Sequence, residues 1–247
     1  MLCVAILDLL HAYSHTGDDA MTFDSKHLVT PENALFIFVD QQPQMAFGVR
    51  SIDTQLLKNN TIALAKTARC FDVPTILTSV ESEGFSGYIW PELLDTLQQD
   101  TYERTTMNLW EDNDVHKAIK KSGRKKLIFS GLWTGVCINQ PALSALEDSY
   151  DVYIVGDACG EVSPEAQYAA MTRAEQAGAV PITSLQLLLE LQRDWSREES
   201  YDGVLNIIRE HYGSYGMGVD YAATHVHKHA QRAHFSQIPH TIYAKSA

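Results

Sequence analysis

With 247 residues, of which 45% are apolar, the chain is long enough for one α/β domain with a sizeable core and too apolar for a disordered protein. Its formal net charge of −12 repels phosphate groups, so nucleic acid and anionic membranes are not expected as partners. The four cysteines form no CxxC pair, which favours free thiols in a reducing cytoplasm over a zinc site or a disulfide framework.

The two ends of the chain lie outside the patterned region. The apolar run at residues 1–10 contains an aspartate, lacks a basic start and is much shorter than the roughly 20 residues of a membrane span. We predict an N-terminal extension over residues 1–20, one domain over 21–221 and a flexible tail rich in His, Ala and Gln over 222–247. The expected location is the cytoplasm, and a secretory signal at the N-terminus is the alternative left open.

Short apolar runs alternate with amphipathic stretches from residue 34 onward. The run ALFIFVD at 34–40 is typical of a strand buried on both faces, and helical spacing follows over 52–72. Further strands are predicted at 74–80, 101–104, 126–131, 151–157 and 179–184, and further helices at 91–99, 112–122, 137–149, 163–177, 185–193 and 202–211. This alternation with short connections predicts right-handed βαβ units, and hence an α/β fold with a parallel sheet.

Three chemically capable residues follow the ends of predicted strands, where open parallel sheets bind their ligands. Asp40 ends the first strand, Arg104 lies at the end of the third, and Cys137 follows the fourth. Cys137 falls in the predicted first turn of a helix, so we expect the helix dipole and a nearby cation to favour its thiolate. Each residue also has a structural alternative: a capping carboxylate, a surface ion pair and a buried apolar thiol.

The stretches around these residues resemble the isochorismatase-like cysteine hydrolases, most closely their YcaC-like branch. They are FVDQQ, RTTMNLWEDNDV, SGRKKLIFSGLWTGVCINQPALSALED, VYIVGDACG and LLLELQRDW, spread over residues 34–200. The resemblance implies an α/β fold, a three-layer Rossmann-like sandwich with a six-stranded parallel sheet. It also implies a catalytic triad of Asp40 as base, Arg104 as cation and Cys137 as nucleophile.

The resemblance implies further features of the site. A non-proline cis peptide between Gly135 and Val136 would direct the N–H groups of Val136 and Cys137 at an oxyanion. Many family members carry lysine where Arg104 stands. Because a guanidinium stays protonated, Arg104 is expected to hold Asp40 and the thiolate in place or to bind an anionic substrate group rather than to shuttle protons. The substrate-binding wall is expected to include four residues that could equally be core or interface residues: Phe47, Asn108, Trp110 and Trp133.

These features predict a hydrolase in which Cys137 attacks a small amide or related C–N carbonyl and forms a thioester. The alternatives are an isochorismatase-type vinyl ether hydrolase and a non-catalytic oligomeric assembly protein on the same fold. A nucleotide-binding oxidoreductase is disfavoured, because no GxGxxG follows the first strand.

The expected partners are a small-molecule substrate and further copies of the chain. A homo-oligomer is predicted because the helical segment 202–215, with Tyr212, Tyr215 and Met217 near its end, needs a surface to cover. No cofactor and no metal are expected. The stretch after the second strand, SVESEGFSGYIWPE, lacks the histidine that metal-dependent nicotinamidases of this superfamily carry there.

Overall fold

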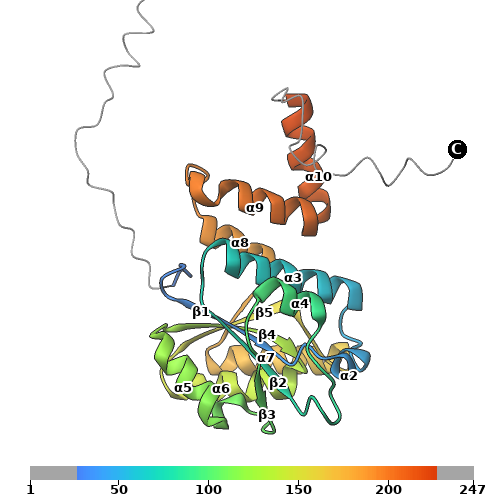
Figure 1. The fold of residues 1–247 in the computed structure, drawn as a ribbon, viewed down its shortest axis with the longest axis vertical. Coiled ribbons are helices and arrows are strands. Elements are labelled where there is room, and N and C mark those ends of the chain that lie inside the picture. Colours follow the sequence, from blue (N-terminus) through green and yellow to red (C-terminus); the bar gives the residue numbers. More distant parts are fainter. Residues whose placement is uncertain (1–26, 227–247) are drawn as a thin grey trace, which may run out of the picture.

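The computed structural model describes residues 27–226, which form a parallel β-sheet between two layers of helices (Figure 1). Six strands lie in the order β3-β2-β1-β4-β5-β6, and each neighbouring pair is parallel. They are β1 (Ala34–Val39), β2 (Thr75–Val80), β3 (Tyr102–Arg104), β4 (Lys126–Leu132), β5 (Asp151–Gly160) and β6 (Val180–Ile182). The predicted fold class, a three-layer Rossmann-like sandwich with a six-stranded parallel sheet, is confirmed.

Helices cover both faces of the sheet (Figure 1). One face carries α3 (Thr54–Cys70), α4 (Pro91–Leu97) and α8 (Ser184–Gln192), and the other carries α5 (Asn113–Ser122), α6 (Asn139–Glu147) and α7 (Pro164–Ala177). α9 (Glu198–His211) packs on α3 and α8, and α10 (Gly213–Tyr221) packs on α9. Shorter segments are α2 (Pro43–Phe47), the 3-10 turn η1 (Leu109–Glu111) and the π-helical turns η2 (Thr134–Ile138) and η3 (Ala222–Val226). No helix within residues 27–226 is long and apolar enough to cross a membrane.

The ends of the helices follow signals in the sequence. The Asp53 side chain caps α3 by accepting the N–H of Leu56, and the Asp112 side chain caps α5 by accepting the N–H of Val115. α5 ends at Gly123, whose φ of 68° is left-handed, so the end of the helix predicted over 112–122 is confirmed. Such caps pair backbone groups that a helix end otherwise leaves unpaired.

The strand order reverses between β1 and β4. The chain moves from β1 outward through β2 and β3, and from β4 outward through β5 and β6 in the other direction. The crevice at the carboxyl ends of β1 and β4 is therefore the place where an open α/β sheet binds its ligand. Where β1 and β4 end, a Cβ on Gly131 would lie 2.0 Å from the Val39 carbonyl oxygen. The close approach of the two central strands is therefore possible because residue 131 is glycine.

Three segments differ from the sequence prediction. The helix predicted over 137–149 is the π-helical turn η2 followed by α6. Neither α2 nor α10 was predicted as a separate helix. α2 is too short to show helical periodicity in the sequence, and α10 contains three glycines, which lower its helix propensity. Helical geometry also continues to Val226, five residues into the tail predicted at 222–247; the rest of that tail and the predicted extension over 1–20 lie outside the described residues.

Candidate active site

Asp40 stands at the point where β1 ends and the chain turns toward α2. Its φ is 59°, in the left-handed region that aspartate tolerates better than most side chains. Its N–H donates to the Thr78 carbonyl of the neighbouring strand, and its own carbonyl accepts the N–H of Gln42. The turn is therefore tied to the sheet, and the Asp40 carboxylate is fully buried beneath the strand ends.

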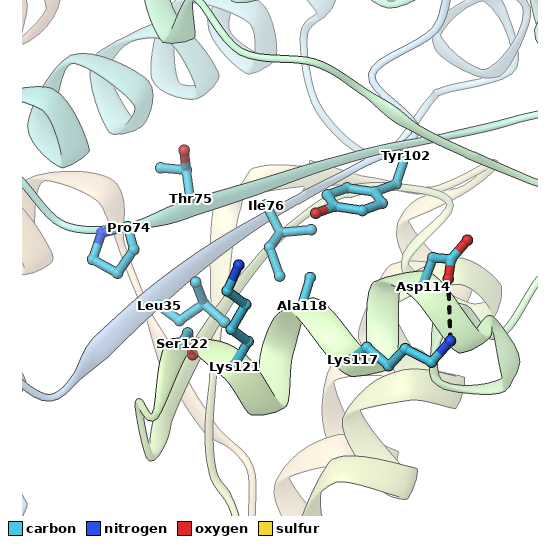
Figure 2. Close-up of a pocket in the computed structure, with 10 residues that line it drawn as sticks. All are labelled: Leu35, Pro74, Thr75, Ile76, Tyr102, Asp114, Lys117, Ala118, Lys121 and Ser122. Carbon is cyan, nitrogen blue, oxygen red and sulfur yellow. Dashed lines mark hydrogen bonds and ion pairs between the residues drawn. The ribbon is translucent and has the colours of Figure 1, made fainter.

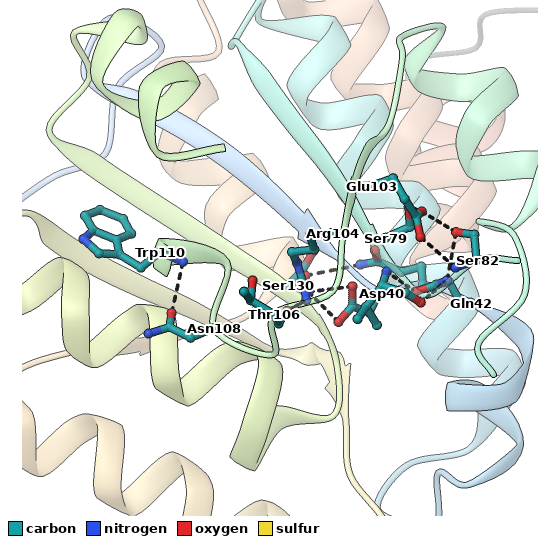
Figure 3. A network of polar contacts seen from close by, with 12 residues as sticks. Asp40, Gln42, Ser79, Ser82, Glu103, Arg104, Thr106, Asn108, Trp110 and Ser130 are labelled. Carbon is teal, nitrogen blue, oxygen red and sulfur yellow. Dashed lines mark hydrogen bonds and ion pairs between the residues drawn. The ribbon is translucent and has the colours of Figure 1, made fainter. Parts of the chain in front are cut away.

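Arg104 lies at the end of β3 and meets this carboxylate in a buried ion pair. One guanidinium nitrogen, Nη2, donates to Asp40 Oδ1 at 2.7 Å and to Oδ2 at 2.6 Å, and neither side chain is exposed (Figure 3). The second nitrogen, Nη1, donates to the Thr106 carbonyl. Nε has no hydrogen-bond partner among the residues that the structure describes. One buried donor of the guanidinium is thus left for a substrate atom or a water molecule.

Cys137 lies in η2, after β4, and completes the group. Its thiol lies close enough to the Asp40 carboxylate and the Arg104 guanidinium for both groups to shift its pKa. The three residues predicted to form the triad therefore lie in mutual contact at the crevice between β1 and β4. They come from the ends of three strands that are neighbours or near neighbours in the sheet.

The pKa of the Cys137 thiol differs from the prediction made from the sequence. Burial, followed by the charge and hydrogen bond of Asp40, raises the pKa of Cys137 to about 12, and Arg104 opposes this shift without overcoming it. The prediction that cation and helix dipole would lower this pKa is wrong, because Cys137 is buried, with 3% of the residue exposed, and burial is the largest cause of the shift. Burial also raises the pKa of Asp40 against the lowering effect of Arg104, which makes this carboxylate a stronger base.

Two expectations concern the backbone around Cys137, and the first of them is wrong. The peptide between Gly135 and Val136 is trans, since residues 27–226 contain no cis peptide. The chain turns through the π-helical η2 instead, and the N–H groups of Val136 and Cys137 both donate to the Trp133 carbonyl at 3.0 Å. The two N–H groups predicted to form an oxyanion hole are therefore already paired in this structure.

Two of the residues predicted to bind substrate flank the carboxyl edge of the sheet. Trp133 directly follows β4, and its Nε1 donates to the Met45 carbonyl in α2 at 3.0 Å. Its ring lies against Gly48, where an added Cβ would come within 3.0 Å of it. Phe47, at the end of α2, is 69% exposed. Both residues stand on segments that directly adjoin the triad and can contact a bound ligand.

Asn108 and Trp110 have other partners. Asn108 caps η1 by accepting the N–H of Trp110, and its Nδ2 donates to Ser144 of α6 at 3.1 Å. The Trp110 indole donates to Asp148 at 3.0 Å and packs edge-on against Tyr150, which precedes β5 at the amino edge of the sheet. In Figure 3 Trp110 points away from the ion pair. The structure thus does not bring Trp110 together with the triad, and Asn108 supports the loop after β3.

Sequence reasoning missed a polar network that holds the loop after β2. The Gln42 side chain exchanges two 3.0 Å hydrogen bonds with the backbone of Val80. The Glu103 carboxylate accepts the hydroxyl groups of Ser79 and Ser82, each at 2.6 Å (Figure 3). These residues flank Asp40 and Arg104 in the chain, and the second glutamine of FVDQQ was the available signal for the network.

A cavity of about 630 Å³ lies elsewhere, between α5 and the amino ends of β1, β2 and β3 (Figure 2). Its lining includes Leu35, Thr75 and Tyr102, none of which belongs to the triad. Because parallel sheets carry their chemistry at the opposite edge, we do not assign the reaction to this cavity. Within residues 27–226 no cluster of three or more His, Cys, Asp or Glu side chains is arranged to hold a metal ion.

The chain matches the family model of the isochorismatase domain over residues 34–186. It is 36% identical over 185 residues to the probable hydrolase YcaC of Escherichia coli (strain K12), and the match covers 74% of this chain and 88% of that protein. The structure of YcaC from Pseudomonas aeruginosa with hexane-2,5-diol and covalent acrylamide has a TM-score of 0.77 and 35% identity, covering 81% of this chain and 99% of the other. The Escherichia coli YcaC structure, described as an octameric hydrolase of unknown specificity, has a TM-score of 0.76 and 33% identity, covering 81% and 98%.

The similarity includes the whole of the site. The stretch that matches the family model begins at the first residue of β1 and ends within α8, so it contains all six strands of the sheet. Asp40, Arg104 and Cys137 all lie within it. The chain therefore belongs to the isochorismatase family of hydrolases and, within it, to the YcaC-like members.

Proposed function

We propose that the protein hydrolyses a small, neutral amide or a related C–N carbonyl compound through a thioester on Cys137. The observation that carries this proposal is the buried contact of the Cys137 thiol with the Asp40 carboxylate and the Arg104 guanidinium. A thiol, a base and a cation that meet at a strand-end crevice are the groups that acyl transfer requires.

The chemistry begins from a neutral thiol. Because its pKa is raised to about 12, Cys137 is protonated at neutral pH, and Asp40 takes the proton as the sulfur attacks the carbonyl carbon. The C–N bond then breaks, the amine leaves with the proton from Asp40, and a thioester remains on the sulfur. Water, deprotonated by Asp40, attacks the thioester, releases the carboxylic acid and returns the proton to the thiol.

The developing oxyanion needs a donor. The Nε–H of Arg104 supports this role, since it is buried, carries part of a positive charge and has no partner among the described residues. The N–H groups of Val136 and Cys137, which the sequence resemblance favoured, could serve once η2 opens, because both now donate to the Trp133 carbonyl.

The charges around the site favour a neutral substrate over the isochorismatase-type alternative. The charge of Arg104 is balanced by Asp40 at 2.6 Å, and the negative charge of Glu103 also acts on Asp40. A substrate that carries carboxylate groups, as isochorismate does, would meet this excess of negative charge. A neutral amide with an apolar body would instead meet Phe47 and Trp133.

Two properties of relatives support parts of the proposal. The Pseudomonas aeruginosa protein carries covalent acrylamide, and acrylamide is an electrophile that thiolates attack, as a reactive cysteine on this fold would do. The Escherichia coli protein is octameric, and on that basis we also propose that this chain forms a homo-oligomer. Assembly without catalysis is the alternative that activity measurements decide.

The test is a screen of the purified protein against small amides and carbamoyl compounds. We expect Cys137→Ala to abolish turnover of whichever compound is hydrolysed, and Asp40→Asn to lower kcat by about 10²-fold or more. Cys70→Ala is the matched control, since Cys70 lies at the far end of α3 against α9. Mass spectrometry of the quenched reaction should detect the acyl group on the peptide that contains Cys137. Parent-like turnover by Cys137→Ala would refute the thioester mechanism.

A further inference from the structure

A buried carboxylate holds the turn that carries Cys137. Glu161 follows the last residue of β5, and 5% of its surface is exposed. Its Oε2 accepts the N–H of Gly135 at 2.6 Å, and its Oε1 accepts the N–H of Val162 at 2.8 Å. Both oxygens are thus held by backbone N–H groups, and one of these groups lies two residues before the proposed nucleophile.

The main chain of Glu161 is held as well. Its N–H donates to the Ser51 hydroxyl at 2.9 Å, and its carbonyl accepts the N–H groups of Arg50 and Ser51 at 2.9 and 3.1 Å. The segment between α2 and α3 therefore fixes Glu161 from the opposite side. The position of the Glu161 carboxylate is therefore fixed, because it cannot move without breaking several hydrogen bonds.

Gly135 makes the close approach possible. A Cβ built on this residue would lie 3.1 Å from Glu161 Oε2. Within η2 the N–H groups of Val136 and Cys137 are paired with the Trp133 carbonyl, while the N–H of Gly135 donates to Glu161. A carboxylate that accepts an N–H group at the start of a helical segment stabilises that segment by hydrogen bonding and by charge.

α7 supports the same segment from its other side. The Thr134 hydroxyl donates to Gln167 at 2.6 Å, and the Asn139 side chain donates to the Ala170 carbonyl at 2.9 Å. The turn is thus anchored at both of its ends by α7 and near its start by Glu161. Of these anchors, the one made by Glu161 is the charged one.

We propose that Glu161 is a positioning residue, which fixes η2 through the N–H of Gly135 and thereby sets the direction of the Cys137 thiol. This inference rests on the proposed function, because it takes Cys137 as the attacking group. Glu161 acts on the thiol through the backbone of η2 and not by a direct effect of its charge, since the charged groups that shift the pKa of the thiol are Asp40 and Arg104.

Three variants test the role of Glu161. In Glu161→Ala the turn loses its anchor, and we expect kcat on the hydrolysed amide to fall by about 10²-fold with little change in KM. Glu161→Gln keeps one carbonyl oxygen for the N–H of Gly135, loses the charge and the acceptor for the N–H of Val162, and should restore part of the rate. Glu165→Ala is the matched control, because it removes an exposed carboxylate from the first turn of α7 and should behave as the parent does.

Alkylation of Cys137 by iodoacetamide gives a readout that does not depend on the substrate. Release of η2 relaxes both the burial of the thiol and its contact with Asp40, so in Glu161→Ala the alkylation should begin at a lower pH than in the parent. Peptide mass mapping across a range of pH measures this profile. Glu161→Gln should keep the parent's profile, which a residue acting by its charge would not.

Gly135→Ala approaches the same hydrogen bond from the other side, and it keeps the inference testable if Glu161→Ala fails to fold. Its Cβ presses on the Glu161 carboxylate, so it should impair kcat in the same way, and the double variant should be little worse than either single one. Parent-like kcat and alkylation in Glu161→Ala, or a Gln variant as impaired as the Ala variant, would overturn the inference. If Cys137→Ala itself retains turnover, the proposed function fails instead, so the two failures are distinguishable.

Discussion

At the scale of single residues, the site depends on the balance between burial and charge at Cys137. The thiol is in contact with a cation, which favours the thiolate, and with a carboxylate, which opposes it. Burial adds to the effect of the carboxylate, so the thiol stays protonated until a base acts on it. In the proposed mechanism, the reactivity of this cysteine is therefore produced by Asp40 during the reaction rather than by a thiolate present beforehand.

Asp40→Asn separates these two effects. The change removes a negative charge that raises the pKa of Cys137, so this pKa should fall and the thiolate fraction at about pH 8 should rise, up to about tenfold for each unit of pKa. We expect faster alkylation of Cys137 by iodoacetamide together with a loss of turnover, because no base remains. Labelling rates from mass mapping, with Cys70 as the internal reference, measure the first effect. Slower labelling in this variant would contradict the balance described.

Arg104 is expected to orient Asp40 rather than to carry a proton, because a guanidinium stays protonated. Arg104→Lys should keep measurable turnover, since a single nitrogen of Arg104 contacts both Asp40 oxygens and an ammonium can reproduce that contact. Arg104→Ala leaves a buried carboxylate without its cation, and should lose most activity and about 3–5 kcal/mol of stability. Initial rates and urea unfolding check both variants. An alanine variant as active and as stable as the parent would remove Arg104 from the site.

At the scale of elements, the parallel pairing of β1 with β4 brings the strand that ends at Asp40 beside the strand that leads to Cys137. Val39 and Gly131 are register partners, and the parallel pairing continues over six residue pairs. Because both strands are fully buried, a change in their spacing would move the carboxylate relative to the thiol. The separation of the proposed catalytic groups is thus a property of the sheet.

Gly131→Ala should disrupt the pairing of β1 with β4 at their carboxyl ends. The new Cβ would lie 2.0 Å from the Val39 carbonyl oxygen, a backbone atom that cannot move aside without separating the central strands. We expect a loss of more than about 4 kcal/mol in the free energy of unfolding, or failure to fold. Gly123→Ala is the control: its φ is also positive, but nothing lies within 4 Å, so it should lose about 1–2 kcal/mol. Equal unfolding midpoints for the two variants would contradict this account.

At the scale of the whole molecule, the sandwich carries an additional layer made by α9 and α10. α9 buries Val204, Ile207 and Ile208, which form a second apolar cluster with residues of α3 and α8. α10 continues outward with Met217 and Tyr221 exposed, the former at 73% (Figure 1). Exposed apolar side chains on a projecting helix are typical of a surface that another chain covers.

The proposed homo-oligomer is therefore expected to use α10. Light scattering of the purified protein should give a mass well above the 27.6 kDa of one chain. Met217→Glu places a charge in the apolar surface and should shift the mass downward while leaving the circular dichroism spectrum unchanged. A parent protein that is monomeric at micromolar concentration would disprove the assembly.

The sequence by itself determined the order and approximate bounds of the strands and most helices, and the family. Burial on both faces of the sheet leaves continuous apolar runs such as 34–40, and caps such as Gly123 mark helix ends; both are properties of neighbouring residues in the chain. The resemblance around Asp40, Arg104 and Cys137 also located the candidate triad. The α10 helix escaped prediction because its glycines hide it, and its formation depends on packing against α9.

Only the tertiary structure decided how these residues interact. Asp40 and Arg104 are 64 positions apart in the chain and Glu161 is 26 positions from Gly135, yet both pairs are hydrogen-bonded. Two predictions failed at this level: the pKa of Cys137 is raised instead of lowered, and Trp110 turns away from the site. Both failures have one physical reason. Desolvation and side-chain contacts depend on the layers that close over a residue, and these layers come from segments that are distant in the sequence.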